Sequence, residues 1–262
     1  MKIIKSVHSY HNFEGTVRRK NRFFYDTEIE DFLQTILETS KSRLETIPKD
    51  AVLWRSQLGH DWEPQYEEDV YMGDWPCPFR IARMKPMAYA AYEGRANPKG
   101  IPYLYLSTDK NTSMAEVRPW IGSYISLGQF KLLKDVTLVN CTSDAKKHMI
   151  YFEEPADPNE REIAVWGEID GAFSKPVTPD ESVADYIPTQ ILAEFFKKNG
   201  FDGIAYRSSL GKGHNIALFD LNAADLIAPY MKRKKFYLIL NNLQIPILYR
   251  NIIQIRSPKL RI

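Results

Sequence analysis

The stretch EGRANPKGIPYLYLSTDKNTSMAEVRP, residues 93–119, constrains the fold more than any other part of this sequence. It begins with turn-forming residues, continues as an apolar strand over 101–109 and predicts a short helix over 111–119. Tyr103 and Tyr105 share one face of that strand, because side chains alternate along a strand. The fold must therefore hold a loop, a strand and a helix in direct succession.

The remaining pattern predicts an α+β domain. In chain order, we expect a helix over 27–44, strands over 51–59, 124–133 and 134–142, a helix over 188–198, and strands over 201–209, 215–221 and 236–242. Residues 60–87 are expected to form a long loop or insertion, in which Pro76 and Pro78 exclude regular structure, and residues 143–180, with Pro155, Pro158, Pro176 and Pro179, are expected to be irregular. Strands and helices do not alternate strictly, so we predict a small, mostly antiparallel sheet with flanking helices.

Charge and composition suggest three parts: an N-terminal helical lobe (1–48), a main domain (49–230) and a basic C-terminal tail (231–262). The tail has eight Lys and Arg residues and no Asp or Glu. Such a tail can meet nucleic acid, an acidic partner or an anionic substrate. No known nucleic-acid-binding signature accompanies it, so we favour a solvated charge cluster and expect no direct nucleic-acid contact.

Several other classes of protein are disfavoured. Cys77 and Cys141 stand far apart without a CxxC pair, so neither a zinc ribbon nor a thioredoxin-type site is expected, and two reduced thiols are favoured over a single disulfide. No run of about 18 apolar residues occurs, and the N-terminus does not have the pattern of a signal peptide. We therefore expect a cytoplasmic protein with no membrane partner. The acidic runs indicate solvated loops, and no metal site is expected.

Three residues of the 93–119 unit have chemistry that suits an anionic, sugar-bearing substrate. Arg95 offers a guanidinium fork for phosphate. Tyr105 offers a ring to bound a heterocycle. Glu116 offers a carboxylate that can stabilise a developing oxocarbenium ion or bind ribose hydroxyls. Read from spacing alone, the favoured interpretation is that Arg95 and Glu116 are surface charges and that the tyrosines belong to the core.

The loop LGKGHN (210–215) allows two interpretations. Gly211 and Gly213 can leave backbone N–H groups free for a phosphate, although the loop satisfies no P-loop pattern. A plain turn between two strands is the commoner meaning. His214 can act as an acid or base, but a hydrogen-bonded turn histidine is the more frequent case.

The ordered motifs of this sequence resemble the RES family, named for its Arg, Glu and Ser. The matching positions are Leu53-Trp54-Arg55, Gly94-Arg95, Asn97-Pro98, Gly100, Tyr105-Leu106, Ala115-Glu116, Asp202-Gly203-Ile204, Tyr206, Ser208, Asn215 and Leu218-Phe219. They fall in family order over about residues 51–221. A chance match of four motifs in the order of the family is improbable.

The resemblance implies an ADP-ribosyltransferase-like fold for residues 49–230 and an NAD-degrading activity. RES proteins are usually toxins of bacterial toxin–antitoxin pairs. They cleave NAD at the nicotinamide–ribose bond and pass the ADP-ribosyl group to water or phosphate. The implied partners are NAD, as substrate rather than cofactor, inorganic phosphate as a possible co-substrate, and an antitoxin protein of the helix-turn-helix type.

The resemblance also implies residue roles. Arg55 and Arg95 would hold the pyrophosphate or the attacking phosphate, and Tyr105 would pack near the nicotinamide ribose. Glu116 would stabilise the oxocarbenium-like transition state, and Ser208 would hydrogen-bond the substrate. The wider set of expected substrate contacts adds Ser209, which can replace Ser208 in the motif, and Asn215.

The sequence leaves two other functions open. A protein or nucleic-acid ADP-ribosyltransferase would share the NAD site and differ only in its acceptor. A non-catalytic nucleic-acid-binding module would use the basic tail, bind in a salt-sensitive way and leave NAD intact.

Overall fold

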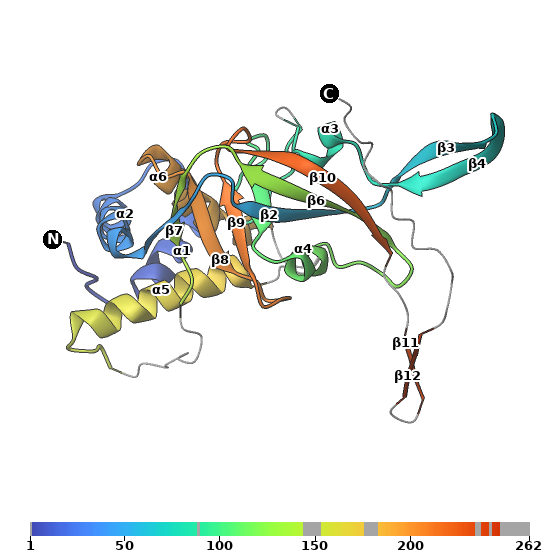
Figure 1. The fold of residues 1–262 in the computed structure, drawn as a ribbon. Helices are drawn as coiled ribbons and strands as arrows, with labels where there is room; N and C mark the ends of the chain where they lie inside the picture. Colours follow the sequence, from blue (N-terminus) through green and yellow to red (C-terminus); the bar gives the residue numbers. More distant parts are fainter. Residues whose placement is uncertain are drawn as a thin grey trace.

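The computed structural model describes residues 2–87, 90–143, 153–175, 183–233, 237–240 and 243–246 (Figure 1). Its helices are α1 (Ser9–Arg19), α2 (Thr27–Ser40), α3 (Ile81–Met84), α4 (Lys110–Glu116), α5 (Pro158–Ser174) and α6 (Ile187–Lys198), with 3-10 turns η1 (Lys41–Arg43) and η2 (Val183–Tyr186). Its strands are β1 (Leu44–Ile47), β2 (Val52–Leu58), β3 (Asp61–Glu67), β4 (Val70–Cys77), β5 (Leu104–Ser107), β6 (Tyr124–Leu132), β7 (Val136–Asn140), β8 (Gly203–Arg207), β9 (His214–Leu218), β10 (Ala224–Arg233), β11 (Tyr237–Leu240) and β12 (Leu243–Pro246).

Eight strands form one sheet in the order β1-β7-β8-β9-β5-β2-β6-β10. Every neighbouring pair is antiparallel except β7 and β8. The expected α+β architecture with a mostly antiparallel sheet and flanking helices is thus confirmed. The two strands expected over 124–142 both exist, as β6 and β7, but they are not neighbours, because four strands of the sheet (β8, β9, β5 and β2) lie between them.

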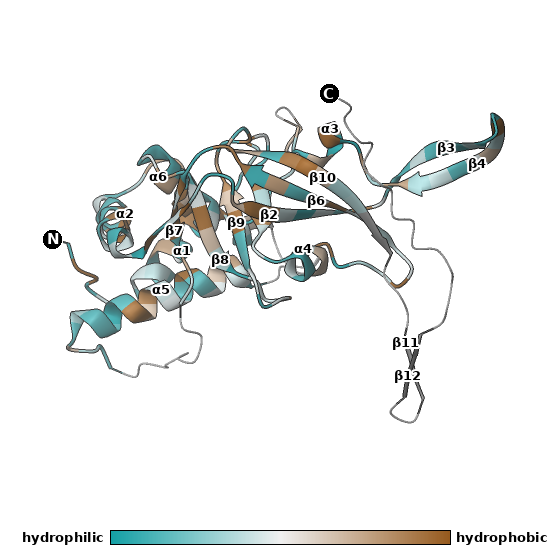
Figure 2. Cartoon of the chain, in the orientation of Figure 1, coloured by the Kyte–Doolittle hydropathy of each residue, from teal (hydrophilic) through white to brown (hydrophobic). Residues whose placement is uncertain are grey.

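The sheet has an apolar core on each face. One core joins α1, α2, α5 and α6 to side chains such as Tyr103, Ile204 and Ala217. The other consists mainly of strand side chains, among them Leu106 and Ile216, with Phe79 and Met84 from the segment around α3. Figure 2 shows the matching apolar stretches along the central strands. The expected lobe over 1–48 shares the first core, and its β1 pairs with β7; the division into three parts stays a prediction.

The irregular interpretation of 143–180 is wrong for its described second half, which forms helix α5. Pro158 suggested irregular structure, but it lies in the first helical turn, where a missing N–H costs nothing. Asp157 caps this helix through the backbone N–H of Asn159 at 2.9 Å. Helix α1 was likewise not expected; its buried Tyr10, Phe13 and Val17 follow helical spacing within a polar segment.

The expectation of a loop over 60–87 is also wrong, because β3 and β4 form an antiparallel hairpin within this range. Pro76 was read as excluding regular structure, yet it lies within β4 opposite Trp62. A two-stranded hairpin consists of edge strands, where a proline without an N–H is tolerated. The hairpin projects from the body of the molecule at the end of the sheet opposite α2 (Figure 1). Within the described residues, no helix is long and apolar enough to span a membrane.

Candidate active site

A polar cluster begins where the helix-side core ends, at one end of three neighbouring strands. On this face, β8 carries Ile204 and Tyr206, and Ser208 follows directly after the strand. The neighbouring strand β9 carries Asn215 and Ala217 on the same face. On β5, Ser107 pairs with Asn215 in register. The register of the three strands therefore places these polar side chains next to one another, because side chains two residues apart along a strand lie on the same face.

Glu116 is the centre of this cluster. It ends helix α4, which is capped by Asp109 and packs against β2, β5 and β9. Its Oε1 accepts hydrogen bonds from Ser208 Oγ at 2.6 Å and from Asn215 Nδ2 at 2.7 Å. Asn215 is fixed in turn, because its Oδ1 accepts from Ser107 Oγ at 2.8 Å. A carboxylate at a helix C-terminus is disfavoured by the helix dipole, so these donors offset an unfavourable position.

The two adjacent serines are distinguished by this geometry. Ser208 is buried, donates to Glu116 and accepts from the backbone N–H of Leu210 at 3.1 Å. Ser209 is exposed and takes no part in these contacts. The structure therefore brings Ser208, rather than Ser209, to the carboxylate.

Arg95 is held by the ends of two helices. Its Nη1 donates to the carbonyl oxygens of Phe173 at 2.8 Å and Ser174 at 3.3 Å, at the C-terminus of α5. Its own carbonyl accepts from Thr189 Oγ1 at the start of α6, at 2.5 Å. A cation is favoured at a helix C-terminus, which explains why this loop arginine has a defined position without a carboxylate partner in the described part of the chain.

Arg55 extends from β2 and donates from Nη1 to the carbonyl oxygen of Tyr105 at 2.9 Å. Its Nε is buried and has no hydrogen-bond partner among the described residues. Burial lowers the pKa of this guanidinium to about 10, and the neighbouring Tyr105 offsets part of this shift. A half-buried cation with an unsatisfied donor is suited to an anionic ligand.

Tyr105 holds the loop that carries Arg95. Its hydroxyl donates to Asn97 Oδ1 at 2.7 Å and accepts from the backbone N–H of Ala96 at 3.0 Å. A Cβ at position 94 would lie 2.7 Å from this hydroxyl, so only Gly94 fits. Gln190 adds bonds to the carbonyls of residues 94 and 97, at 3.0 and 3.1 Å. The hydrogen bonds of the hydroxyl are thus used within the loop. The expected contact of Tyr105 with the nicotinamide ribose would therefore come from its ring.

Tyr206 matches a family motif position in the sequence but was not among the residues expected in the site. Burial raises the pKa of its phenol well above the usual value, and the neighbouring groups Tyr105, Arg95 and Glu116 also influence it. Tyr206 pairs in register with Asn215, which donates to Glu116. Its ring centroid lies 5.6 Å from that of Phe173, whose carbonyl accepts from Arg95. Alternation along β8 was the available signal, since Tyr206 precedes Ser208 by two residues.

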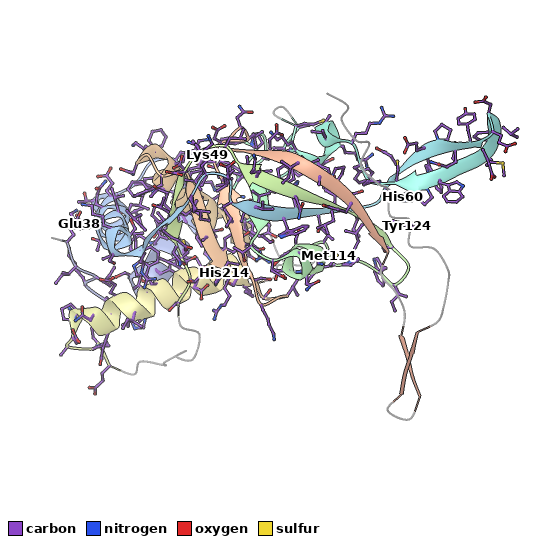
Figure 3. The ribbon with its side chains drawn as sticks, viewed as in Figure 1. Glu38, Lys49, His60, Met114, Tyr124 and His214 are labelled. Atoms are coloured by element: carbon purple, nitrogen blue, oxygen red, sulfur yellow. The ribbon has the colours of Figure 1, made fainter. Side chains whose placement is uncertain are left out.

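The glycine-rich turn of residues 210–213 joins β8 to β9 and packs on the start of α4. The backbone N–H of Gly213 donates to Thr112 Oγ1 at 2.9 Å, and there is no room for a Cβ at Gly211 against Thr112. This donor is therefore already used, which favours the turn over a phosphate cradle. His214 is exposed, and its backbone N–H donates to Thr108 Oγ1 at 2.9 Å (Figure 3).

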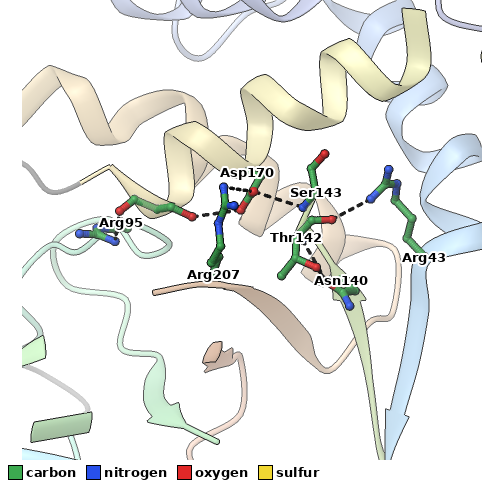
Figure 4. Close-up of polar contacts among 8 residues, drawn as sticks. Arg43, Arg95, Asn140, Thr142, Ser143, Asp170 and Arg207 are labelled. Atoms are coloured by element: carbon green, nitrogen blue, oxygen red, sulfur yellow. Dashed lines mark hydrogen bonds and ion pairs between the residues drawn. The ribbon is translucent and has the colours of Figure 1, made fainter. Parts of the chain in front are cut away.

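A buried ion pair supports the same region from α5. Asp170 accepts from Arg207 at 2.5 Å and also from Ser174 Oγ and the Ser143 backbone N–H (Figure 4). Arg207 immediately precedes Ser208, and Ser174 supplies a carbonyl to Arg95. This network ties β8 to the helix end that holds the loop arginine.

No group of three or more His, Cys, Asp or Glu side chains in the described ranges is arranged to hold a metal ion. A cavity of about 530 Å³ lies away from the cluster, lined by residues that include Arg43, Asn140 and Glu162. This cavity is lined by none of the candidate site residues Arg55, Arg95, Tyr105, Glu116 and Ser208.

The RES domain family model matches residues 75–238, more than half of the chain. This chain belongs to the RES family. The match includes Arg95, Tyr105, Glu116 and Ser208, while Arg55 precedes it. No curated protein matches the sequence. Among solved structures, the M. tuberculosis MbcT–MbcA toxin–antitoxin complex is similar at 13% identity and a TM-score of 0.43, covering 76% of this chain and 92% of that one.

Proposed function

We propose that this RES protein cleaves NAD at the nicotinamide–ribose bond and passes the ADP-ribosyl group to phosphate or water. The observation that carries the proposal is the state of Glu116. Oε1 is fixed by Ser208 and Asn215, while no partner of Oε2 is found among the described residues. A carboxylate oriented in this way can stabilise positive charge that develops nearby.

The chemistry requires little else from the protein. When the bond between nicotinamide and ribose breaks, the electron pair leaves with the ring nitrogen, which becomes neutral, and the ribose carbon becomes cationic. An oxygen of phosphate or water then attacks this carbon. Glu116 would stabilise the oxocarbenium-like transition state, as carboxylates do in glycosidic chemistry. NAD is the substrate in this scheme, and no further cofactor is invoked.

Arg55 and Arg95 would hold the anionic part of the substrate. Neither forms an ion pair with a carboxylate within the described residues, and each uses only Nη1 in the hydrogen bonds described above. The remaining guanidinium donors match the fork geometry that phosphate oxygens prefer. The Tyr105 hydroxyl and Gln190 would act by fixing the loop that positions Arg95.

The biological proposal follows from the family. A protein that depletes NAD in the cytoplasm arrests growth unless it is restrained. We therefore propose a toxin role and a restraining antitoxin partner, of the helix-turn-helix type found with many RES proteins. Family membership supports this partner, and co-expression with a neighbouring gene product that restores growth would test it.

Product analysis of the purified protein with NAD tests the central proposal. Release of nicotinamide that requires phosphate and yields ADP-ribose 1″-phosphate identifies a phosphorylase. Release without phosphate that yields ADP-ribose identifies a glycohydrolase. Transfer of labelled ADP-ribose to a macromolecule would instead identify a transferase, and intact NAD from folded, partner-free protein would contradict the enzymatic proposal.

The two serines offer a matched test of the geometry. We expect Ser208→Ala to lower kcat by roughly 10- to 100-fold, because a hydrogen bond to a charged group contributes about 1.5–3 kcal/mol. Ser209→Ala makes the same substitution at the adjacent position and should keep the wild-type rate. Steady-state NAD loss measures both. Equal rates for the two variants would remove Ser208 from the proposed site.

Replacing Tyr105 with phenylalanine separates loop anchoring from substrate contact. The variant keeps the ring and leaves Asn97 Oδ1 and the Ala96 N–H without their partner. We expect the free energy of unfolding to fall by about 1–3 kcal/mol and KM for NAD to rise, with a smaller change in kcat. Denaturant unfolding and steady-state kinetics give both quantities. A large fall in kcat at unchanged stability would mean that the hydroxyl contacts the reacting group.

A further inference from the structure

The β3–β4 hairpin exposes an unusual amount of aromatic surface. Its large apolar side chains are each between 42% and 64% exposed; they are Trp62, Tyr66, Val70, Tyr71, Met72 and Trp75. They occupy both faces, and β3 and β4 pair only with each other among the described strands. A two-stranded hairpin in water is marginally stable without a packing partner, and apolar patches of this kind mark interaction surfaces.

The hairpin is also strongly acidic. Residues 61–77 contain six Asp and Glu residues and no Lys or Arg. Aromatic side chains among carboxylates disfavour an anionic lipid surface or nucleic acid as the occupant, because like charges repel. The surface instead fits an extended segment that combines basic and apolar side chains.

The chain itself contains such a segment. Residues 247–262, here called the terminal segment, read ILYRNIIQIRSPKLRI and carry four Lys and Arg residues with no Asp or Glu. Isoleucine, leucine and tyrosine make up half of these residues. Their charge and apolar character are thus complementary to those of the hairpin, and most of both segments lies outside the family-matched residues 75–238.

The last strand of the main sheet ends at the base of the hairpin. Strand β10, which leads toward the terminal segment, ends with Arg233 paired to Tyr124. The base of the hairpin lies at the same place: the His60 ring packs against Tyr124 in a tilted arrangement with centroids 4.5 Å apart, and the Gly59 N–H donates to the Tyr124 carbonyl at 2.9 Å (Figure 3). The Nε2 atom of His60 is buried there without a hydrogen-bond partner among the described residues.

We propose that the terminal segment docks along the β3–β4 hairpin of its own chain. A strand rises about 3.3 Å per residue, so the hairpin is roughly 25 Å long and eight extended residues can follow it. Residues 234–246 connect the segment to the shared base at Tyr124, and the β11–β12 hairpin within them pairs Tyr237 with Pro246, so the chain returns close to the start of β11. A tether of this length gives an effective concentration on the order of millimolar, which favours the segment over a free competitor.

Hydrogen exchange in the full-length chain tests this docking without reference to activity. We expect the amides of residues 61–77 to lose at least tenfold protection in Arg256→Glu/Lys259→Glu, and equally in Glu63→Lys/Glu67→Lys. Combining the four substitutions restores opposite charges and should recover protection. The matched control, Glu30→Lys/Glu93→Lys, makes the same charge change at two exposed acids elsewhere and should leave 61–77 unchanged.

The remaining outcomes are also decisive. Protection of β8 amides in every variant verifies that the fold is retained. Wild-type protection in both charge-reversed variants overturns the proposal, and so does failure of the fourfold variant to recover. Protection that grows with protein concentration, together with a dimer in light scattering, would assign the surface to a second copy and overturn docking within one chain.

Discussion

Glu116→Gln lowers kcat for NAD cleavage by at least about 100-fold and leaves the fold intact. Glutamine is close in shape to glutamate, and its Oε1 can still accept from Ser208 and Asn215, whose distances are 2.6 and 2.7 Å. The substitution thus removes the negative charge and retains the hydrogen bonds. Loss of one preorganised electrostatic group typically costs a factor of 100 to 1,000 in kcat. Steady-state nicotinamide release measures the change.

The control for this experiment is Glu93→Gln, which neutralises an exposed acid at the start of the same loop–strand–helix unit. It should keep the wild-type rate and the wild-type Tm. The Tm of Glu116→Gln should remain within a few degrees of that value. A Glu116→Gln enzyme with more than half of the wild-type kcat would show that this carboxylate does not stabilise the transition state.

Arg55→Met is expected to abolish efficient NAD cleavage without lowering the stability of the protein. The buried Arg55 charge has no carboxylate partner in the described structure, and burial lowers its pKa to about 10. The charged form therefore opposes folding at neutral pH. Methionine fills a similar volume without a charge, so Tm should stay constant or rise. We expect kcat/KM to fall by at least about 100-fold, because a charge-assisted contact to phosphate is lost.

The sign of the pH dependence provides an independent check. Because the folded-state pKa of Arg55 lies below its unfolded value, the folded protein releases this proton first. Wild-type stability should therefore rise relative to Arg55→Met as the pH increases through about 10. Arg80→Met, at an exposed arginine, is the matched control and should preserve activity. A large fall in Tm for Arg55→Met would assign this arginine a structural role instead.

The positions of the main strands followed from local pattern. The apolar runs that became β2, β5, β6, β8 and β9 were all expected, because alternation and turn residues are local signals. Helix α5 and the β3–β4 hairpin were missed for one reason. Proline was read as a breaker in both, whereas a first-turn position in α5 and an edge strand in the hairpin tolerate it.

The sequence by itself determined the family motifs and the chemical identity of the Arg, Tyr, Glu and Ser side chains. Only the tertiary structure decided which of them meet. Glu116 and Ser208 are 92 positions apart, and their contact depends on the register of β8 against β9 and on the packing of α4 across three strands. The structure also assigned the Tyr105 hydroxyl to its own loop and placed no counter-charge from the described residues beside Arg55. Such outcomes depend on long-range pairing and burial, and neither is encoded in the spacing of residues along the chain.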